Sequence, residues 1–346
     1  MGNYHVPIKM LLKFIFEDCK IQQAPPITKK TLELGSKYSP DFVCVPFKYN
    51  LGNYIEALEN GANVLIQAGG GCRFGYYGEV QEQILRDLGY DFEFIYFLGD
   101  SIKPFSVYKT CRKMGCKLSL YKFAYYIKLI FEVVKSMDKI DDFIRKNIGF
   151  ESELGSFEKM YKKFLNELKA VRNFKSLNYI YKKYNYMFKN IKINKPENCL
   201  KIGLVGELYN LMEPFSNYFI EKELAGYNVE ITRFINVTYL LFEKPKLIKK
   251  TIKEAGKYLK YFIGADGTDT VANSKSLAEL GYDGIIHMKP FGCTPEVNAM
   301  PMLQNISEDF KIPILYFSFD SQTSETGIKT RLEAFNDMLL MRRQKK

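Results

Sequence analysis

Three cysteines of this chain are candidate ligands of a metal cofactor. Cys44, Cys72 and Cys293 each stand where a strand is predicted to end and a helix to begin. In an open α/β fold, ligands bind at the carboxyl ends of the strands. Thiolates select zinc, copper(I) or iron–sulfur clusters, and a helix N-terminus favours their negative charge. We therefore expect the three sulfurs to converge on one metal centre, although Cys293 lies far from the other two in the sequence.

The residues before Cys72 indicate the kind of centre. The run 68–72 (AGGGC) contains three glycines, which let the backbone pass close to a bulky group such as an iron–sulfur cube. Three protein ligands on a four-iron cube leave one iron open to water or substrate. That iron then acts as a Lewis acid, as an open position does in a catalytic metal site.

The other four cysteines are expected to have structural roles. Cys19 and Cys199 lack such a context, and a lone cysteine is usually a small buried hydrophobe. Cys111 and Cys116 form a Cys-x4-Cys pair without the further cysteine of a ferredoxin-type run, so they are structural or accessory. Spacing alone leaves the same structural interpretation open for the three candidate ligands. Seven cysteines at irregular spacing make a poor disulfide framework.

The positive charge of the chain is concentrated in its middle. The net charge of the 346 residues is +11, and the segment 111–195 alone has 20 Lys and Arg against 8 Asp and Glu. Such a segment could meet an acidic partner or a phosphate-bearing ligand, or form solvated lysine-rich helices. We expect no nucleic-acid partner, because no zinc-finger or RNP motif accompanies it. The apolar run 10–16 is short and contains a lysine, so we expect a cytoplasmic protein without a membrane span.

The first part of the chain alternates between strands and helices. The predicted elements are strands at 41–45, 63–67 and 91–98 and helices at 50–60 and 75–88. Gly61 and Gly89 follow the two helices, as is typical of helix C-termini. We therefore expect a βαβαβ unit with a parallel sheet, in an N-terminal α/β lobe of residues 1–110.

The remainder of the chain predicts a helical insertion and a second lobe. Residues 111–195 show helical periodicity at 118–137 and 157–186, so we expect a basic helical insertion. Residues 196–346 alternate again. The predicted elements there are strands at 200–206, 228–234, 284–288 and 314–319 and helices at 213–224, 246–262, 271–280, 295–310 and 326–341. The expected fold class is α/β, with two flavodoxin-like or Rossmann-like lobes, parallel sheets and a helical insertion.

The segment 281–296 (GYDGIIHMKPFGCTPE) resembles the 2-hydroxyacyl-CoA dehydratase family. It looks most like the stand-alone relatives called CoA protein activase or activase-related proteins. The resemblance continues at 309–313 and 330–335, and the N-terminal pieces 44–48 and 69–78 fit the same family. It covers both lobes, about two-thirds of the chain, and the Pro-Phe-x-Cys-x-Pro-Glu motif is fairly specific.

The resemblance implies a cofactor and a type of reaction. One cysteine from each such position binds a [4Fe–4S] cluster in that family, which implies Cys44, Cys72 and Cys293 here, with the cluster between the lobes. Related proteins hold a double-cubane [8Fe–9S] cluster in the same way. An ATP-dependent, cluster-containing activator delivers one low-potential electron to the dehydratase. The electron makes a ketyl radical of an acyl-CoA thioester, which permits loss of an unactivated hydroxyl group.

Several roles remain open within this family. The chain resembles the electron acceptor, which is either a dehydratase (a lyase) or a component of an ATP-coupled reductase. A non-catalytic accessory or electron-relay subunit is an alternative, as is a double-cubane reductase. A homologous second subunit or a homodimer is expected, because the family dehydratases have two unlike subunits. Outside the family, a zinc-binding or cluster-free protein is a further alternative.

Two stretches depart from the family pattern. Residues 264–267 read GADG where relatives have a Gly-Gly-His-Gly-like stretch, and Asp320-Ser321 stands where an acidic pair is common. These departures leave the substrate undetermined. The run 266–269 (DGTD) is superficially similar to a phosphate loop of actin-like ATPases, but it follows a predicted helix, so we expect no ATP site there.

A few further side chains near the candidate ligands have competing interpretations. Glu207 points into the cleft or into solvent, and Arg73 binds an anion or forms a surface salt bridge. His287 is expected to be a hydrogen-bonded core histidine. Glu296 is expected to support the start of its helix, with Thr294 as the cap.

Overall fold

A computed structural model describes residues 2–67, 72, 75–96 and 104–345. The chain divides into two compact units, one of residues 3–131 and one of residues 132–346 together with the first two residues. In the described part of the chain, no helix is long and apolar enough to cross a membrane. A separate helical domain at 111–195, between lobes at 1–110 and 196–346, stays a prediction.

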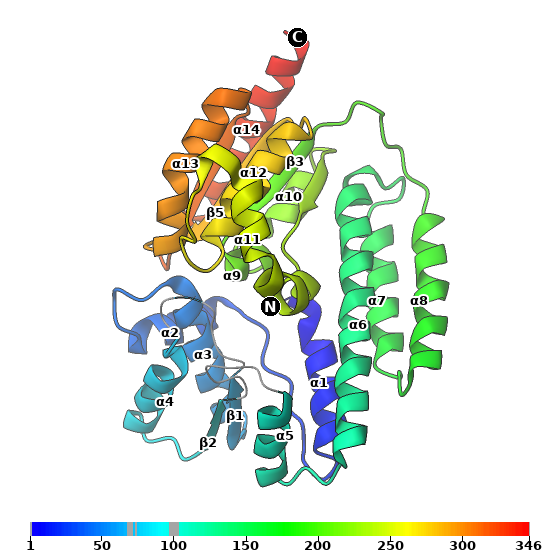
Figure 1. The fold of residues 1–346 in the computed structure, drawn as a ribbon, viewed down its shortest axis with the longest axis vertical. Coiled ribbons are helices and arrows are strands. Elements are labelled where there is room, and N and C mark those ends of the chain that lie inside the picture. The colour runs from blue at the N-terminus through cyan, green and yellow to red at the C-terminus, as the bar shows by residue number, and fades with distance from the viewer. Residues whose placement is uncertain (1, 68–71, 73–74, 97–103, 346) are drawn as a thin grey trace. The chain divides into compact units, whose positions relative to one another are not determined.

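The unit of residues 3–131 contains a two-stranded parallel sheet. Strands β1 (Val64–Gln67) and β2 (Glu93–Tyr96) pair in parallel, and α4 (Tyr77–Asp87) connects them (Figure 1). The βαβ unit was predicted correctly, and its core is apolar. The buried members of this core are Phe47, Leu51, Ile55, Leu58, Leu65, Leu85 and Phe92.

The strand predicted at 41–45 is wrong. In the structure Val45 already begins a helix, α3 (Val45–Glu59), and Pro46 lies in its first turn. Proline is tolerated there because the first turn has no intrahelical partner for its missing N–H. The short apolar run before Pro46 therefore forms a turn and a helix start instead of a strand. The predicted helix at 50–60 starts five residues earlier than expected.

Four further helices belong to this unit, wholly or in part. They are α1 (His5–Ile15), α2 (Lys29–Tyr38), α5 (Pro104–Lys113) and the first part of α6 (Leu120–Asn147). Helices α2 and α3 cross closely at Gly52, where a Cβ atom would lie 1.9 Å from the carbonyl oxygen of Thr31. The Thr31 hydroxyl also donates to Glu56 at 2.6 Å, which ties the two helices together.

The helical middle of the chain was predicted correctly in type. Besides α6 it contains α7 (Ser156–Leu168) and α8 (Phe174–Lys189). The helical periodicity at 157–186 corresponds to two helices, because the Asn173 side chain accepts the Ser176 amide and caps a new helix. Within the unit that begins at Glu132, stacked aromatic rings such as Phe157 and Phe188 hold α7 against α8.

The unit of residues 132–346 contains a four-stranded parallel sheet in the order β4-β3-β5-β6. Its strands are β3 (Lys201–Gly206), β4 (Glu230–Arg233), β5 (Gly284–Pro290) and β6 (Ile314–Phe319). All four strands were predicted, and the α/β class with parallel sheets is confirmed. The surrounding helices are α9 (Leu208–Met212), α10 (Ile220–Ala225), α11 (Lys244–Ala255), α12 (Gly267–Glu279), α13 (Thr294–Phe310) and α14 (Glu325–Gln344).

The strand order creates a switch point between β3 and β5. The chain leaves β3 for β4 on one side and then crosses to β5 on the other side of β3. Helices α11, α12 and α13 share one apolar core with Val205 and Ile285. Phe335 and Leu339 of α14 pack on Gly284. In open α/β sheets, ligands bind outside the carboxyl ends of the strands at such a switch point.

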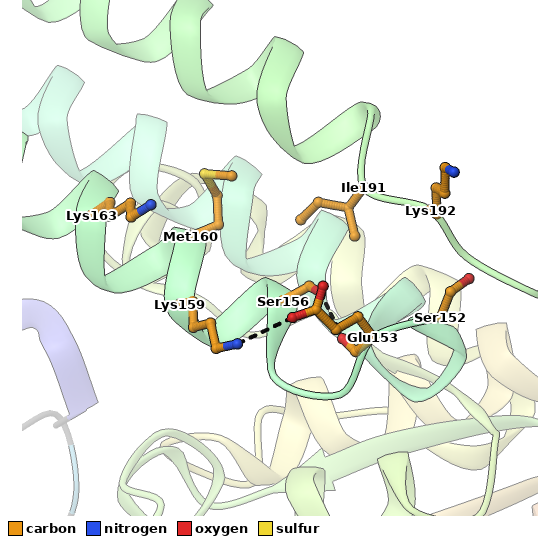
Figure 2. A pocket seen from close by; sticks show the side chains of 8 residues that line it. All are labelled: Ser152, Glu153, Ser156, Lys159, Met160, Lys163, Ile191 and Lys192. Atoms are coloured by element: carbon orange, nitrogen blue, oxygen red, sulfur yellow. Dashed lines mark hydrogen bonds and ion pairs between the residues drawn. The ribbon is translucent and has the colours of Figure 1, made fainter.

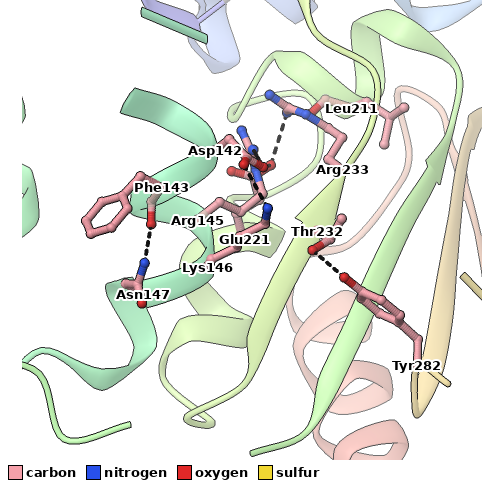
Figure 3. Close-up of polar contacts among 10 residues, drawn as sticks. All are labelled: Asp142, Phe143, Arg145, Lys146, Asn147, Leu211, Glu221, Thr232, Arg233 and Tyr282. Carbon is pink, nitrogen blue, oxygen red and sulfur yellow. Dashed lines mark hydrogen bonds and ion pairs between the residues drawn. The ribbon is translucent and has the colours of Figure 1, made fainter. Parts of the chain in front are cut away.

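An ionic cluster with two buried arginines ties α6 to this sheet. The Glu221 carboxylate of α10 accepts hydrogen bonds from Arg145 Nε of α6 and from Arg233 Nη1 of β4, each at 3.0 Å (Figure 3). The arginines are 7% and 8% exposed. Burial raises the pKa of Glu221, but the two guanidinium groups outweigh burial and hold it below its usual value. The carboxylate therefore stays ionised between two buried cations.

Candidate functional site

Cys293 lies at the carboxyl end of β5, where the sequence predicted it. The strand ends at Pro290, a turn with Gly292 at φ 75° follows, and Cys293 is the N-cap of α13. Pro295 occupies the first turn of the helix. The side chain is partly exposed. A sulfur at this position faces the positive end of the helix dipole.

A fully buried acid–histidine pair supports the turn that carries Cys293. Glu296 Oε2 lies 2.8 Å from His287 Nε2, and both side chains are 0% exposed. The Thr270 hydroxyl of α12 donates to the other Glu296 oxygen at 3.2 Å. Glu296 thus joins α13 to β5 and α12. The buried position predicted for His287 is confirmed.

The predicted cap at this helix start is wrong. Cys293, not Thr294, is the N-cap residue, and Thr294 is the first residue of the helix. Glu296 does support the helix start, but it does so through His287 and Thr270 and not by accepting backbone amides.

Lys289 brings a buried cation close to Cys293. It lies on β5, four residues before the cysteine, and it is 5% exposed. Burial lowers the pKa of Lys289, and the neighbouring Cys293 and Glu296 oppose that shift. The Lys289 ammonium group would therefore compensate the negative charge of an anionic sulfur or ligand at the end of β5.

The carboxyl end of β3 contributes a second acidic group. Gly206 has φ 137°, and a Cβ atom there would lie 1.9 Å from the carbonyl oxygen of Met288. The glycine therefore allows β3 to end tightly against β5 and to present Glu207. The Glu207 carboxylate accepts the amides of Tyr209 and Asn210 at 3.0 Å each. Burial and the nearby Asp266 raise the pKa of Glu207 to about 8, against the effect of the two amides.

Sequence reasoning missed a lysine held between two aspartates beside Glu207. Lys244 Nζ lies 2.5 Å from Asp266 and 2.8 Å from Asp269. The Tyr239 hydroxyl donates to Asp269 at 2.5 Å. Burial lowers the pKa of Lys244, but the two carboxylates outweigh burial and raise it above its usual value. Lys244 follows η3, a π-helix at Tyr239–Glu243, and such distortions are frequent at functional sites.

The loop with Asp266 packs directly on the start of α13. A Cβ atom at Gly267 would lie 2.4 Å from the carbonyl oxygen of Pro295. Asp266 also accepts the Leu208 amide at 3.0 Å, so it bridges the segments after β3 and before α12. The carboxyl edge of this sheet therefore gathers Cys293, two lysines and several carboxylic acids, a set that can bind a ligand and exchange protons. The aspartates already bind Lys244, which leaves them poorly suited to a phosphate.

Cys44 also lies at a helix start, in the other unit. It is the N-cap of α3, and its sulfur lies 2.8 Å from the Tyr77 hydroxyl at the start of α4. The Tyr77 ring packs edge-on against Phe47, with ring centroids 4.9 Å apart. The side chain of Cys44 is partly exposed.

Cys72 is exposed and precedes Tyr77 by five residues. A chain of five residues spans at most about 18 Å, so Cys72 lies within that distance of α4, which begins beside Cys44. The glycines at 69–71 and Arg73 lie outside the described residues. Their predicted roles near a cofactor stay predictions.

The remaining cysteines differ in environment. In the described part of the chain, Cys19, Cys111, Cys116 and Cys199 form no disulfide. Cys111 and Cys116 are buried in an apolar cluster, and burial and Cys116 together raise the pKa of the Cys111 thiol to about 12. Cys199 is buried as predicted, whereas Cys19 is exposed, so the prediction that it is buried is wrong.

The three candidate ligands fit an iron–sulfur cluster in their chemistry. All three thiols are at least partly exposed, and Cys44 and Cys293 lie at helix N-termini, where negative sulfur is favoured. Among the described side chains, no group of three or more His, Cys, Asp or Glu could hold a single metal ion. Cys44 and Cys72 belong to one unit and Cys293 to the other, so the convergence of the three sulfurs stays a prediction.

A pocket of about 390 Å³ lies beside α7 (Figure 2). Lys159, Lys163 and Lys192 line it, together with Ser152 and other side chains. Lys159 is paired with Glu153 at 3.2 Å. None of the candidate cysteines lines this pocket.

Comparison with protein families identifies a family model that matches most of this chain. The family model described as 2-hydroxyglutaryl-CoA dehydratase, D-component, matches residues 113–339. The matched region contains Cys293, Glu207, Lys244 and nearly all of the helical middle, whereas Cys44 and Cys72 precede it. No curated protein matches the chain.

Proposed function

The chain belongs to the 2-hydroxyglutaryl-CoA dehydratase D-component family, and from this premise we propose that it is the iron–sulfur component of a reductive dehydratase system. Cys44, Cys72 and Cys293 would hold a [4Fe–4S] cluster, and an ATP-dependent activator would supply a low-potential electron. The substrate class would be an acyl-CoA. A homologous subunit or a second copy would complete the enzyme.

The observation that carries this proposal is the position of Cys293. It caps a helix at the carboxyl end of β5, beside the switch point of a parallel sheet, within the region that matches the family. Ligand sites of open α/β sheets lie at this edge. Cys44 shares the helix N-cap position, at the start of α3, with Tyr77 beside its sulfur, but a turn and not a strand precedes it.

When bound, a three-cysteine cluster would store one electron and offer one iron for a substrate oxygen. The protein's own groups act around it. Lys289 compensates negative charge at the end of β5, and the His287–Glu296 pair holds the first turn of α13 in place. Burial and Asp266 raise the pKa of Glu207 to about 8 on the same sheet edge, which favours its protonated form.

The test is iron and acid-labile sulfide content after anaerobic purification, with electron paramagnetic resonance before and after dithionite. About four iron per chain is expected, and replacing Cys44, Cys72 or Cys293 with alanine removes it. Cys199→Ala and Cys19→Ala are the matched controls, one buried and one exposed, and both keep the iron.

The outcomes separate the alternatives. Equal iron in all five variants, or no iron after anaerobic reconstitution, contradicts the proposal. About eight iron per chain points to a double-cubane reductase instead. A reducible cluster without turnover of any acyl-CoA, even with an activator and a second subunit, leaves the electron-relay role.

A further inference from the structure

Helix α8 presents a regular stripe of lysines and tyrosines to solvent. The members of this stripe are Lys175, Tyr179, Lys182, Tyr186 and Lys189. At 3.6 residues per turn they lie within about 80° of the helix circumference and extend over about 21 Å. Tyr179 is 68% exposed and Tyr186 is 71% exposed. Two large aromatic side chains on one helix face are therefore accessible to another molecule.

The opposite face of the helix already accounts for its folding. Leu177, Ile180, Tyr184 and Phe188 are buried there. Phe164 of α7 contacts both Tyr184 and Phe188, with ring centroids 5.3 Å and 6.5 Å apart. The exposed tyrosines are therefore not required to hold α8 against α7.

The stripe also carries charge that the protein does not neutralise. Helix α8 contains no Asp or Glu. Lys183, which lies outside the stripe, pairs with Glu167 at 2.6 Å. By contrast, the three stripe lysines make no ion pair with any described residue. The segment 111–195 has 20 basic and 8 acidic residues, so the surroundings add to this positive potential.

We propose that the stripe on α8 is a docking surface for an acidic surface of a partner protein. Tyrosines between charged side chains are typical of the energetically important residues of protein interfaces, and complementary charge steers association. A membrane is disfavoured, because the stripe contains no aliphatic side chain to insert. This docking proposal rests on the proposed function only because a component of a dehydratase system is expected to bind another protein.

The experiment measures binding of the full chain to a fluorescein-labelled acidic helical peptide by anisotropy. A peptide of roughly 15 residues, composed of glutamate and leucine, spans the stripe at 1.5 Å per residue. The charge-reversal variant K175E/K182E/K189E is expected to bind the peptide about tenfold more weakly. In this variant, three exposed lysine–glutamate attractions between the stripe and the peptide become repulsions. The variant Y179S/Y186S is expected to lose about threefold, because ring contacts are removed without a change in charge.

The matched control lies on α11. Lys246, Lys249 and Lys253 are exposed, lie on one helix and have no tyrosine between them. The variant K246E/K249E/K253E has the same change in net charge, and it is expected to bind less than about twofold more weakly. Circular dichroism of each variant checks that the helices are intact.

Three results would overturn the proposal. Equal weakening by the two charge-reversal variants shows diffuse attraction without a site. Tighter binding of a short DNA duplex, lost in the α8 variant, identifies a nucleic-acid surface. Binding of anionic vesicles, lost in the same variant, identifies a membrane surface. Iron content of the same samples separates this inference from the proposed function, because the α8 substitutions leave all cysteines unchanged.

Discussion

Removal of Glu221 is expected to destabilise the larger unit strongly. The substitution Glu221→Ala leaves Arg145 and Arg233 buried without the carboxylate that each contacts at 3.0 Å. Breaking a buried ion pair by removing one partner costs roughly 3–5 kcal/mol. We place the effect at the lower end, about 3 kcal/mol, because Glu221 is 34% exposed and Arg233 keeps its bond to the Leu211 carbonyl.

Thermal and urea unfolding measure this loss. For a unit of this size, 1 kcal/mol lowers the melting temperature by roughly 2–4 °C, so Glu221→Ala should lower it by about 6–12 °C. The difference in melting temperature between Glu221→Ala and the natural protein should become smaller at acidic pH. The pKa of Glu221 is held below its usual value, so its contribution is present above the ordinary glutamate pKa and is lost as the pH falls through the folded-state value.

The control is two residues away on the same helix. Glu223 pairs with the half-exposed Lys329 at 3.2 Å, and Glu223→Ala should cost about 1 kcal/mol or less. If Glu221→Ala and Glu223→Ala differ by less than about 1 kcal/mol, the burial argument for the Arg145–Glu221–Arg233 cluster is refuted.

Two further predictions concern the carboxyl end of β3. Gly206→Ala should destabilise the larger unit by about 3 kcal/mol, because the new Cβ meets the Met288 carbonyl and the φ of 137° disfavours a side chain. Gly281→Ala, at φ 73° with nothing within 4 Å, should cost only about 1 kcal/mol in the same urea titration. Glu207 has a pKa raised from 4.5 to about 8, so its contribution to stability is complete below pH 4.5 and is lost as the pH rises through 8. Glu207→Gln should therefore flatten the decline of the melting temperature between pH 6 and pH 9, and an unchanged slope would count against the raised pKa.

Much of the fold could be predicted from the sequence. Strands β5 and β6 of the larger unit are largely apolar runs that begin at Gly284 and directly after Pro313, which is the pattern of a buried parallel strand. The helical middle follows from its period of 3.6 residues. The strand predicted at 41–45 failed because a short apolar run does not distinguish a strand from the first turn of a buried helix.

Some features of the candidate site could also be predicted from the sequence, and others depend on tertiary packing. The position of Cys293 could be read from the sequence, because a glycine and a proline mark the turn and the helix start on either side of it. The association of Lys244 with Asp266 and Asp269 could not, since these residues lie 22 and 25 positions apart and meet only when α11 packs against α12. Glu296 looked like a helix-start acid in the sequence, and only tertiary packing gave it His287 as a partner at 2.8 Å. Local pattern thus determined most of the elements and the position of Cys293, whereas burial and long-range packing decided which charges face one another.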